Sequence, residues 1–209
     1  MRSRNTVGPP TLGVDHRVAD NGELLLRGDM VFAGYYKNDE ATAQSIRDGW
    51  LHTGDVVCQE ADGHLRIVDR LKDIMITAGG KNLTPSEIEN TMKGSPYIKE
   101  CVIVADGRKF VGALIQIDYE TVGKWAEAQR IPFTHFRSLT EHPEVRKLID
   151  AEVARGNARL AQVSQIRRFY LLVKELDHDD GDVTATMKVR RSSIYKSYAT
   201  EIEALYQQA

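Results

Sequence analysis

The sequence has few of the features that mark disulfide-rich, metal-stabilised or membrane-spanning proteins. Its 209 residues include only two cysteines, Cys58 and Cys101, which cannot build a disulfide framework and have no metal-ligand spacing around them. No apolar run reaches the roughly 18 residues that cross a bilayer, and the first residues lack the hydrophobic stretch of a signal peptide. We therefore expect reduced cysteines, no metal site and a cytoplasmic location.

The sequence also lacks an excess of charge of either sign. Its 28 basic and 30 acidic residues leave a net charge of −2, which argues against nucleic acid or an anionic membrane as the main partner. The apolar fraction of 42% is typical of soluble globular proteins. The length suits one domain of about 130–150 residues with a smaller piece beside it.

One phosphate-binding motif is absent as well. Lys81 follows Gly79 and Gly80, but no serine or threonine follows the lysine, so the pattern Gly-x-x-x-x-Gly-Lys-Ser/Thr does not occur. A P-loop of that kind is excluded.

Short strands and turns characterise the first third of the chain. Residues 55–60 and 64–69 read as the two strands of a hairpin, with Gly63 supplying the turn between them. We predict a partial, incomplete β subdomain over residues 1–70.

Helix and strand signals alternate after Leu71. A proline and a capping-box pattern at residues 84–87 predict a helix start, and Gly94 predicts its end. The apolar runs 101–105 and 111–117 predict an antiparallel hairpin. Further expected elements are helices over 121–130 and 144–160, a third strand over 169–173 and one closing helix over 194–206. Residues 71–209 should form an α+β domain with a small, mostly antiparallel three-stranded sheet flanked by helices.

Four segments, in this order, resemble the carboxy-terminal motifs of the adenylate-forming superfamily, which includes acyl-CoA synthetases, luciferases and the adenylation domains of peptide synthetases. They are residues 49–55, 68–73, 76–89 and 180–191. The long stretch between Tyr119 and Arg168 and the ending of the last segment are most similar to bacterial long-chain fatty acyl-CoA synthetases.

The resemblance implies a two-step ligase reaction. A fatty-acid carboxylate attacks the α-phosphate of ATP to give acyl-AMP and pyrophosphate, and the thiol of CoA then displaces AMP. The resemblance assigns residues 1–70 to the end of the family's large amino-terminal adenylation domain and residues 71–209 to its mobile carboxy-terminal domain. The family's phosphate loop, magnesium-binding glutamate and acyl pocket belong to the part of the amino-terminal domain that these residues do not contain. We expect that domain to be the main partner, ATP or AMP, CoA and Mg²⁺ to be ligands of the complete enzyme, and the isolated chain to be inactive. Peripheral location at the inner membrane and homo-oligomers through exposed β edges are also expectations.

The resemblance assigns three polar residues to the chemistry. Asp55 corresponds to the aspartate that accepts hydrogen bonds from both ribose hydroxyls, and Arg70 to the arginine beside the nucleotide sugar. Lys188 corresponds to the catalytic lysine that contacts the substrate carboxylate and the α-phosphate. Taken singly, each also fits a structural interpretation: a turn aspartate, a strand-end arginine and a solvated loop lysine.

The resemblance assigns the remaining positions to movement. Lys72 corresponds to the domain hinge, where backbone rotation matters more than the side chain. Gly79 and Gly80 correspond to a loop that lines the pantetheine passage during the CoA step, because glycine allows close approach to the backbone. An ordinary surface lysine and a tight hairpin are the structural alternatives.

Two functions of different class remain open from the sequence. The chain is the carboxy-terminal part of a long-chain fatty acid–CoA ligase, or it is a non-catalytic module that binds CoA, a nucleotide or a protein partner. Calorimetry with AMP, ATP and CoA on the isolated chain distinguishes them.

Overall fold

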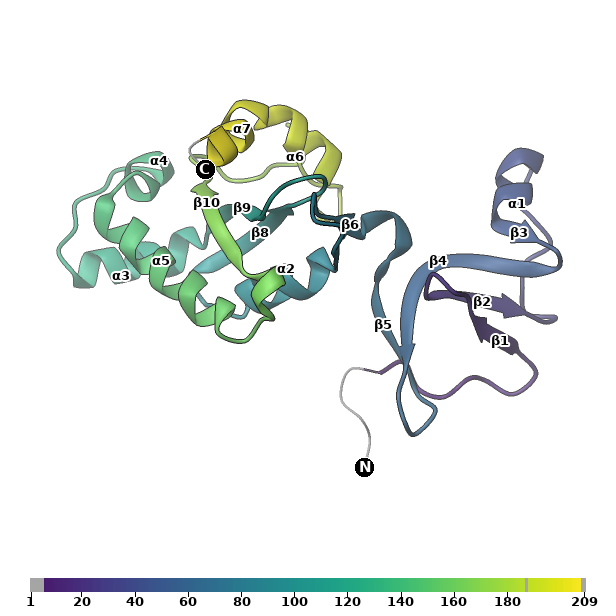
Figure 1. Cartoon of the computed structure of the whole chain (residues 1–209). Coiled ribbons are helices and arrows are strands. Elements are labelled where there is room, and N and C mark those ends of the chain that lie inside the picture. The colour runs from purple at the N-terminus through teal and green to yellow at the C-terminus, as the bar shows by residue number, and fades with distance from the viewer. Residues whose placement is uncertain (1–5, 187, 208–209) are drawn as a thin grey trace. The chain divides into compact units, whose positions relative to one another are not determined.

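The structure is a computed structural model that describes residues 6–186 and 188–207, and it divides into two compact units. The first unit is Met1–Ile74 and the second is Met75–Ala209 (Figure 1). The predicted boundary lies after residue 70, at the end of β5 (Leu65–Arg70), the last strand of the first unit. The assignment of the first unit to a larger amino-terminal domain stays a prediction.

The first unit is an antiparallel sheet with one short helix. Its elements are β1 (Asp15–Val18), β2 (Glu23–Arg27), α1 (Asp39–Ser45), β3 (Ile46–Arg47), β4 (Trp50–Gln59), β5 (Leu65–Arg70) and the 3₁₀ turn η1 (Leu71–Asp73). The sheet order is β1-β2-β4-β3, and β5 also pairs with β4. The predicted hairpin is confirmed as β4–β5, with Gly63 in its turn at φ 83°. The strands described here do not close into a barrel.

The first unit buries few large apolar side chains and exposes many. Its buried apolar residues among those described are Leu25, Val56, Val57 and Leu65. Large apolar side chains that remain exposed include Leu12, Met30, Phe32, Tyr35 and Tyr36. This imbalance is compatible with an incomplete subdomain, which stays a prediction.

The second unit combines a three-stranded sheet, a short hairpin and helices. Its elements are β6 (Met75–Ile76), β7 (Asn82–Leu83), α2 (Pro85–Lys93), β8 (Ile98–Val104), β9 (Val111–Ile117), α3 (Tyr119–Ala128), α4 (Phe136–Thr140), α5 (Pro143–Asn157), η2 (Gln162–Ser164), β10 (Ile166–Leu171), α6 (Arg191–Ser197) and α7 (Ala199–Gln207). The larger sheet has the order β10-β9-β8, and β6 pairs with β7. The predicted α+β class is confirmed.

Strand directions in the larger sheet are mixed. The predicted hairpin β8–β9 is antiparallel, with Ile103 opposite Ala113, but β10 runs parallel to β9, with Phe169 also opposite Ala113. The helices α3 to α5 connect β9 to β10. They return the chain to the end of the sheet where β9 begins, because β10 runs in the same direction as β9.

Helices cover both faces of this sheet (Figure 1). On one face, Ile103 and Ile115 pack with Ile88 of α2 and Ile149 of α5. On the other face, the strand residues are Val102, Val104 and Leu114. They pack with residues of the two last helices and the junction between them, which are Ile194, Tyr198 and Ile202. The alternation of side chains along β8 therefore divides the core into two layers.

Two local expectations need correction. The helix after Thr84 begins at Pro85 as predicted, but the Thr84 side chain makes no capping hydrogen bond, so the capping box is wrong. The predicted closing helix is two helices, because the chain leaves helical geometry at Tyr198, with φ −111° and ψ 27°. None of the described helices meets the length and hydropathy needed to cross a membrane.

Candidate functional site

The first candidate cluster lies where β4 and β5 pair. Asp55 and Arg70 stand directly opposite each other in the hairpin register. The Arg70 Nη1 atom lies 3.0 Å from Asp55 Oδ1 and 3.1 Å from the carbonyl oxygen of Thr53. The side chain of Asp55 is 32% exposed and that of Arg70 is 55% exposed. The two predicted nucleotide-binding residues are thus adjacent, paired and open to solvent.

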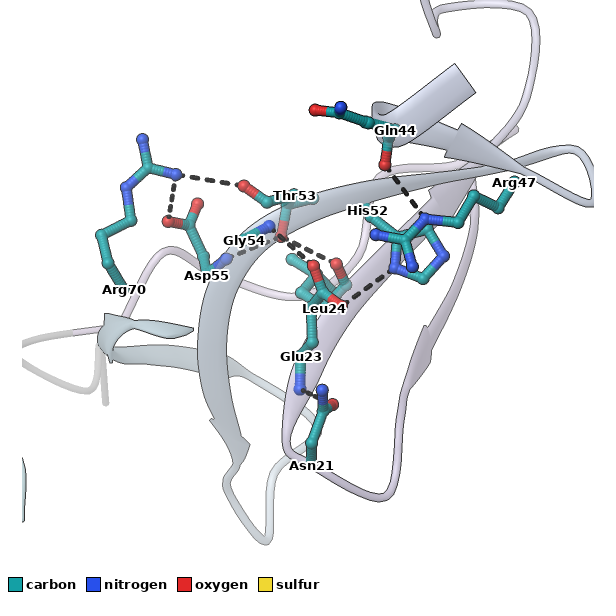
Figure 2. A network of polar contacts seen from close by, with 10 residues as sticks. All are labelled: Asn21, Glu23, Leu24, Gln44, Arg47, His52, Thr53, Gly54, Asp55 and Arg70. Carbon is teal, nitrogen blue, oxygen red and sulfur yellow. Dashed lines mark hydrogen bonds and ion pairs between the residues drawn. The ribbon is translucent and has the colours of Figure 1, made fainter. Parts of the chain in front are cut away.

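A buried glutamate holds the backbone next to Asp55 (Figure 2). Glu23, only 6% exposed, accepts a hydrogen bond from the Gly54 amide at 2.9 Å and contacts His52 Nδ1 at 2.9 Å. Gly54 adopts φ 69°, a left-handed conformation that suits glycine. The Glu23 carboxylate therefore fixes the irregular part of β4 that carries Asp55.

Thr53 supports the same part of β4. Its hydroxyl donates to the carbonyl oxygen of Leu24 at 2.7 Å and accepts from the Asp55 amide at 3.1 Å. Sequence reasoning did not select Glu23, His52 or Thr53. His52 and Thr53 lie within the motif 49–55, but only the pairing of β2 with β4 brings Glu23 to them.

Lys72 lies in the 3₁₀ turn that follows β5. Its side chain is exposed, and the division between the two compact units falls soon after it, between Ile74 and Met75. This placement is compatible with a hinge, and the hinge role stays a prediction.

Gly79 and Gly80 form the exposed end of the hairpin β6–β7. The Thr77 amide donates to the Lys81 carbonyl at 3.0 Å, and the Gly80 amide donates to the Thr77 carbonyl at 2.8 Å. Gly80 adopts φ 74°, whereas Gly79 is not in the left-handed region. A Cβ atom at Gly79 would meet only Thr77 Oγ1, at 3.9 Å. The backbone conformation therefore favours glycine at position 80, whereas position 79 has room for a side chain.

Lys188 lies at the end of a narrow loop. Val183 and Val189 form an antiparallel bridge, and the Thr184 amide donates to the Lys188 carbonyl at 2.8 Å. The Lys188 amide donates to Thr184 Oγ1 at 3.0 Å. The Lys188 side chain is exposed. Met187, which precedes it, lies outside the described residues.

A buried carboxyl lies at the base of this loop. Asp182 is 1% exposed, and neither of its carboxylate oxygens has a hydrogen-bond partner among the described residues. The nearest cation is Lys174 Nζ, at 3.9 Å. Burial raises the pKa of the Asp182 carboxyl, and the charge of Lys174 opposes this only in part. The hydroxyl of Tyr198 is likewise buried without a partner in the described chain.

An ion pair fixes the chain just after the loop. Arg191 Nη1 lies 2.6 Å from Glu89 Oε1, and Arg191 Nη2 lies 3.1 Å from Glu89 Oε2. Burial disfavours the Arg191 cation, but the hydrogen bond and charge of Glu89 outweigh it and raise the arginine pKa. Sequence reasoning missed this pair, because the two residues lie in motifs 102 residues apart.

The predicted site residues thus form two groups. Asp55 and Arg70 form one cluster in the first unit. Gly79, Gly80 and Lys188 lie in two loops of the second unit. No group of three or more histidine, cysteine or acidic side chains suited to a metal ion occurs among residues 6–186 and 188–207. Of the two cysteines, Cys58 is exposed and Cys101 is buried, and both are free.

Comparison with known proteins identifies the second unit. Residues 72–209 match the profile of the family described as AMP-binding enzyme C-terminal domain. Long-chain-fatty-acid–CoA ligase FadD15 of Mycobacterium tuberculosis is 40% identical over 202 residues, which are 96% of this chain and 34% of that protein. The putative fatty-acid–CoA ligase fadD11 of the same species is 42% identical over 203 residues, which are 96% of this chain and 35% of that protein. The chain therefore spans about a third of the length of these relatives.

Solved structures support the fold. The A domain of a carboxylic acid reductase from Segniliparus rugosus, in complex with AMP and a co-purified carboxylic acid, superposes with a TM-score of 0.75. The match covers 98% of this chain and 33% of that one at 21% identity. The adenylation domain of a carboxylate reductase from Mycobacterium chelonae gives a TM-score of 0.74 at 23% identity, over 95% of this chain and 31% of that one. From its motifs, its fold and the match over residues 72–209, the chain belongs to the AMP-binding enzyme C-terminal domain family.

Proposed function

We propose that the chain is the carboxy-terminal part of an ATP-dependent long-chain fatty acid–CoA ligase. The observation that carries this proposal is the 40% identity with FadD15 over 96% of the chain. The chain covers only about a third of that relative, so the proposed partner is the amino-terminal adenylation domain. ATP, CoA, the fatty acid and Mg²⁺ are the proposed ligands of the complete enzyme. The Mg²⁺ ion would accompany the ATP phosphates and a glutamate of the amino-terminal domain.

In this proposal Asp55 and Arg70 bind the nucleotide sugar. A carboxylate is an acceptor-only group, and one carboxylate can accept hydrogen bonds from two neighbouring hydroxyls. Arg70 lies 3.0 Å from one oxygen of Asp55 and holds the carboxylate in place, while the Asp55 side chain remains 32% exposed. Glu23 and Thr53 hold this part of β4 in place, which lowers the ordering cost of binding.

Lys188 is the proposed catalytic residue of the first step. The fatty-acid carboxylate oxygen bonds to the α-phosphorus as pyrophosphate leaves, and negative charge develops on the phosphoryl oxygens. A lysine held beside these oxygens stabilises that charge. The hydrogen bonds between Thr184 and Lys188 hold the loop backbone, while the ammonium group remains exposed and able to reach a nucleotide.

The second step requires a different loop. The thiol sulfur of CoA attacks the acyl carbon and AMP leaves, so the passage for pantetheine must open to the acyl-adenylate. We propose that rotation about Lys72 replaces Lys188 with Gly79 and Gly80 between the steps. The open space around Gly79 supports this role.

Location and assembly complete the proposal. We propose a cytoplasmic ligase that acts at the inner face of the membrane. The edge strand β1 offers a surface for pairing with a second copy of the isolated chain. Sedimentation of the 209-residue chain tests whether two copies pair through β1, and a strict monomer would exclude such pairing.

Two assays test the ligase proposal. The isolated chain should show no fatty-acid-dependent exchange between ATP and pyrophosphate, whereas the complete ligase should exchange and then form acyl-CoA.

In the complete ligase, Gly79→Leu should leave adenylation nearly intact and block thioester formation. Because the backbone of Gly79 is outside the left-handed region, the melting temperature of the Gly79→Leu variant should differ little from that of the wild type. Robust exchange by the isolated chain, or equal loss of both steps in Gly79→Leu, would contradict the proposal. Calorimetry with AMP, ATP and CoA on the isolated chain distinguishes the ligase proposal from the alternative of a non-catalytic binding module.

A further inference from the structure

The loop of Gly79 and Gly80 has little structure of its own. Its hairpin consists of two residue pairs, Met75 with Leu83 and Ile76 with Asn82. An isolated two-stranded hairpin of this size is marginally stable in water at best. The orientation of the loop must therefore come from contacts with another part of the second unit.

Those contacts come from the supporting turn, which we define as residues 105–108 between β8 and β9. The Ile76 amide donates to Asp106 Oδ1 at 3.0 Å, and the Gly107 amide donates to the Ile76 carbonyl at 2.8 Å. The Ala78 amide, next to Gly79, donates to the Arg108 carbonyl at 2.9 Å. Three hydrogen bonds thus tie one strand of the hairpin to the supporting turn.

The supporting turn is itself fixed to the last helix. Arg108 forms a two-pronged ion pair with Glu203 of α7, in which Nη1 lies 3.2 Å from Oε2 and Nη2 contacts Oε1. The Arg108 guanidinium also lies 4.7 Å from the centre of the Tyr206 ring. The Tyr206 hydroxyl donates to the Val104 carbonyl at 2.8 Å. A continuous set of contacts therefore runs from α7 through the turn to the Gly79–Gly80 loop.

We propose that Asp106 is a positioning residue for the thioester-forming step, acting through the Gly79–Gly80 loop. This inference rests on the proposed function of that loop. Asp106 is exposed, so its truncation opens no cavity in the core. Its loss frees the Ile76 amide at the base of the hairpin and leaves the loop with two of its three anchors. The described residues of the Lys188 loop share none of these hydrogen bonds, so adenylation should not depend on Asp106.

The first test uses the 209-residue chain. In Asp106→Ala, amide hydrogen exchange at Ile76 and Ala78 should be about 3–10-fold faster than in the wild type, the effect of losing one hydrogen bond. Asp106→Asn keeps an Oδ1 acceptor and should restore slow exchange. Lys109→Ala is the matched control from the same exposed segment and should change nothing. Unchanged exchange in Asp106→Ala would overturn the proposal.

The second test uses the complete ligase and measures the two half-reactions separately. Asp106→Ala should slow thioester formation from supplied acyl-AMP by about 3–10-fold, with adenylation unchanged and Asp106→Asn close to wild type. A merely structural role would slow both steps together and lower the melting temperature, and that result would overturn the proposal. Gly79→Leu serves as the reference. If Gly79→Leu separates the two steps and Asp106→Ala does not, this inference alone fails; if Gly79→Leu does not separate them, the proposed function of the loop fails.

Discussion

The ion pair between Glu89 and Arg191 allows a sharp prediction about stability. The Arg191 side chain is 24% exposed and the Glu89 side chain 12% exposed. Besides the two contacts with Glu89, Arg191 donates to the Ile103 carbonyl at 3.1 Å. Glu89 Oε1 also accepts from the Ile103 amide at 2.9 Å. The pair therefore joins α2, β8 and the start of α6, immediately after the Lys188 loop.

Arg191→Ala should lower the free energy of unfolding of the second unit by about 3 kcal/mol. Removal of one partner from a buried pair costs about 3–5 kcal/mol, because the other charge remains desolvated. The lower end applies here, since Glu89 retains the Ile103 amide and part of its contact with water. For a domain of this size the melting temperature falls by about 2–4 °C per kcal/mol, or about 6–12 °C in total.

Urea and thermal unfolding of the isolated chain measure this loss. Arg190→Ala removes an exposed neighbouring guanidinium and should cost less than about 0.5 kcal/mol. The double variant Glu89→Leu with Arg191→Met should recover part of the stability, because it removes the desolvated carboxylate but leaves the buried Ile103 amide without its acceptor. A cost below about 1 kcal/mol for Arg191→Ala would show that the pair behaves as a surface ion pair and would refute the reasoning.

Three further predictions concern the candidate site. In the complete ligase, Lys188→Ala should slow adenylation by about 10²–10³-fold and spare thioester formation from supplied acyl-AMP; equal losses would indicate damaged folding instead. Glu23→Ala should weaken AMP binding to the complete ligase, measured by calorimetry, because the Gly54 amide beside Asp55 loses its acceptor, and Glu23→Gln should recover part of the affinity. Unchanged affinity in Glu23→Ala would remove Glu23 from the site. Asp182→Asn should raise the melting temperature at neutral pH. Burial raises the pKa of the native Asp182 carboxyl, so wild-type stability falls as pH rises above the unfolded pKa of about 3.9. The advantage of Asp182→Asn should vanish near pH 3, about one unit below that value, and an advantage that persists there would contradict the assignment.

Local sequence patterns determined the elements that follow local rules. The hairpin β4–β5 was predictable because glycine at position 63 takes the positive φ that its turn requires. The helix α2 was predictable because Pro85 suits a first helical turn and Ile88 and Met92 recur at helical spacing. The candidate residues Asp55, Arg70 and Lys188 came from motif resemblance, and their surroundings could not be derived from it.

Tertiary structure decided which residues support those candidates. Glu23 reaches the Gly54 amide 31 residues away only because β2 pairs with β4. Asp106 reaches the Ile76 amide 30 residues away because the β8–β9 turn lies against the hairpin β6–β7. Gly80 adopts a positive φ and Gly79 does not, although the two positions are adjacent and hold the same residue type. Composition and periodicity reflect the interactions of a residue with its near neighbours in the chain, whereas these contacts depend on strand register and packing between distant segments.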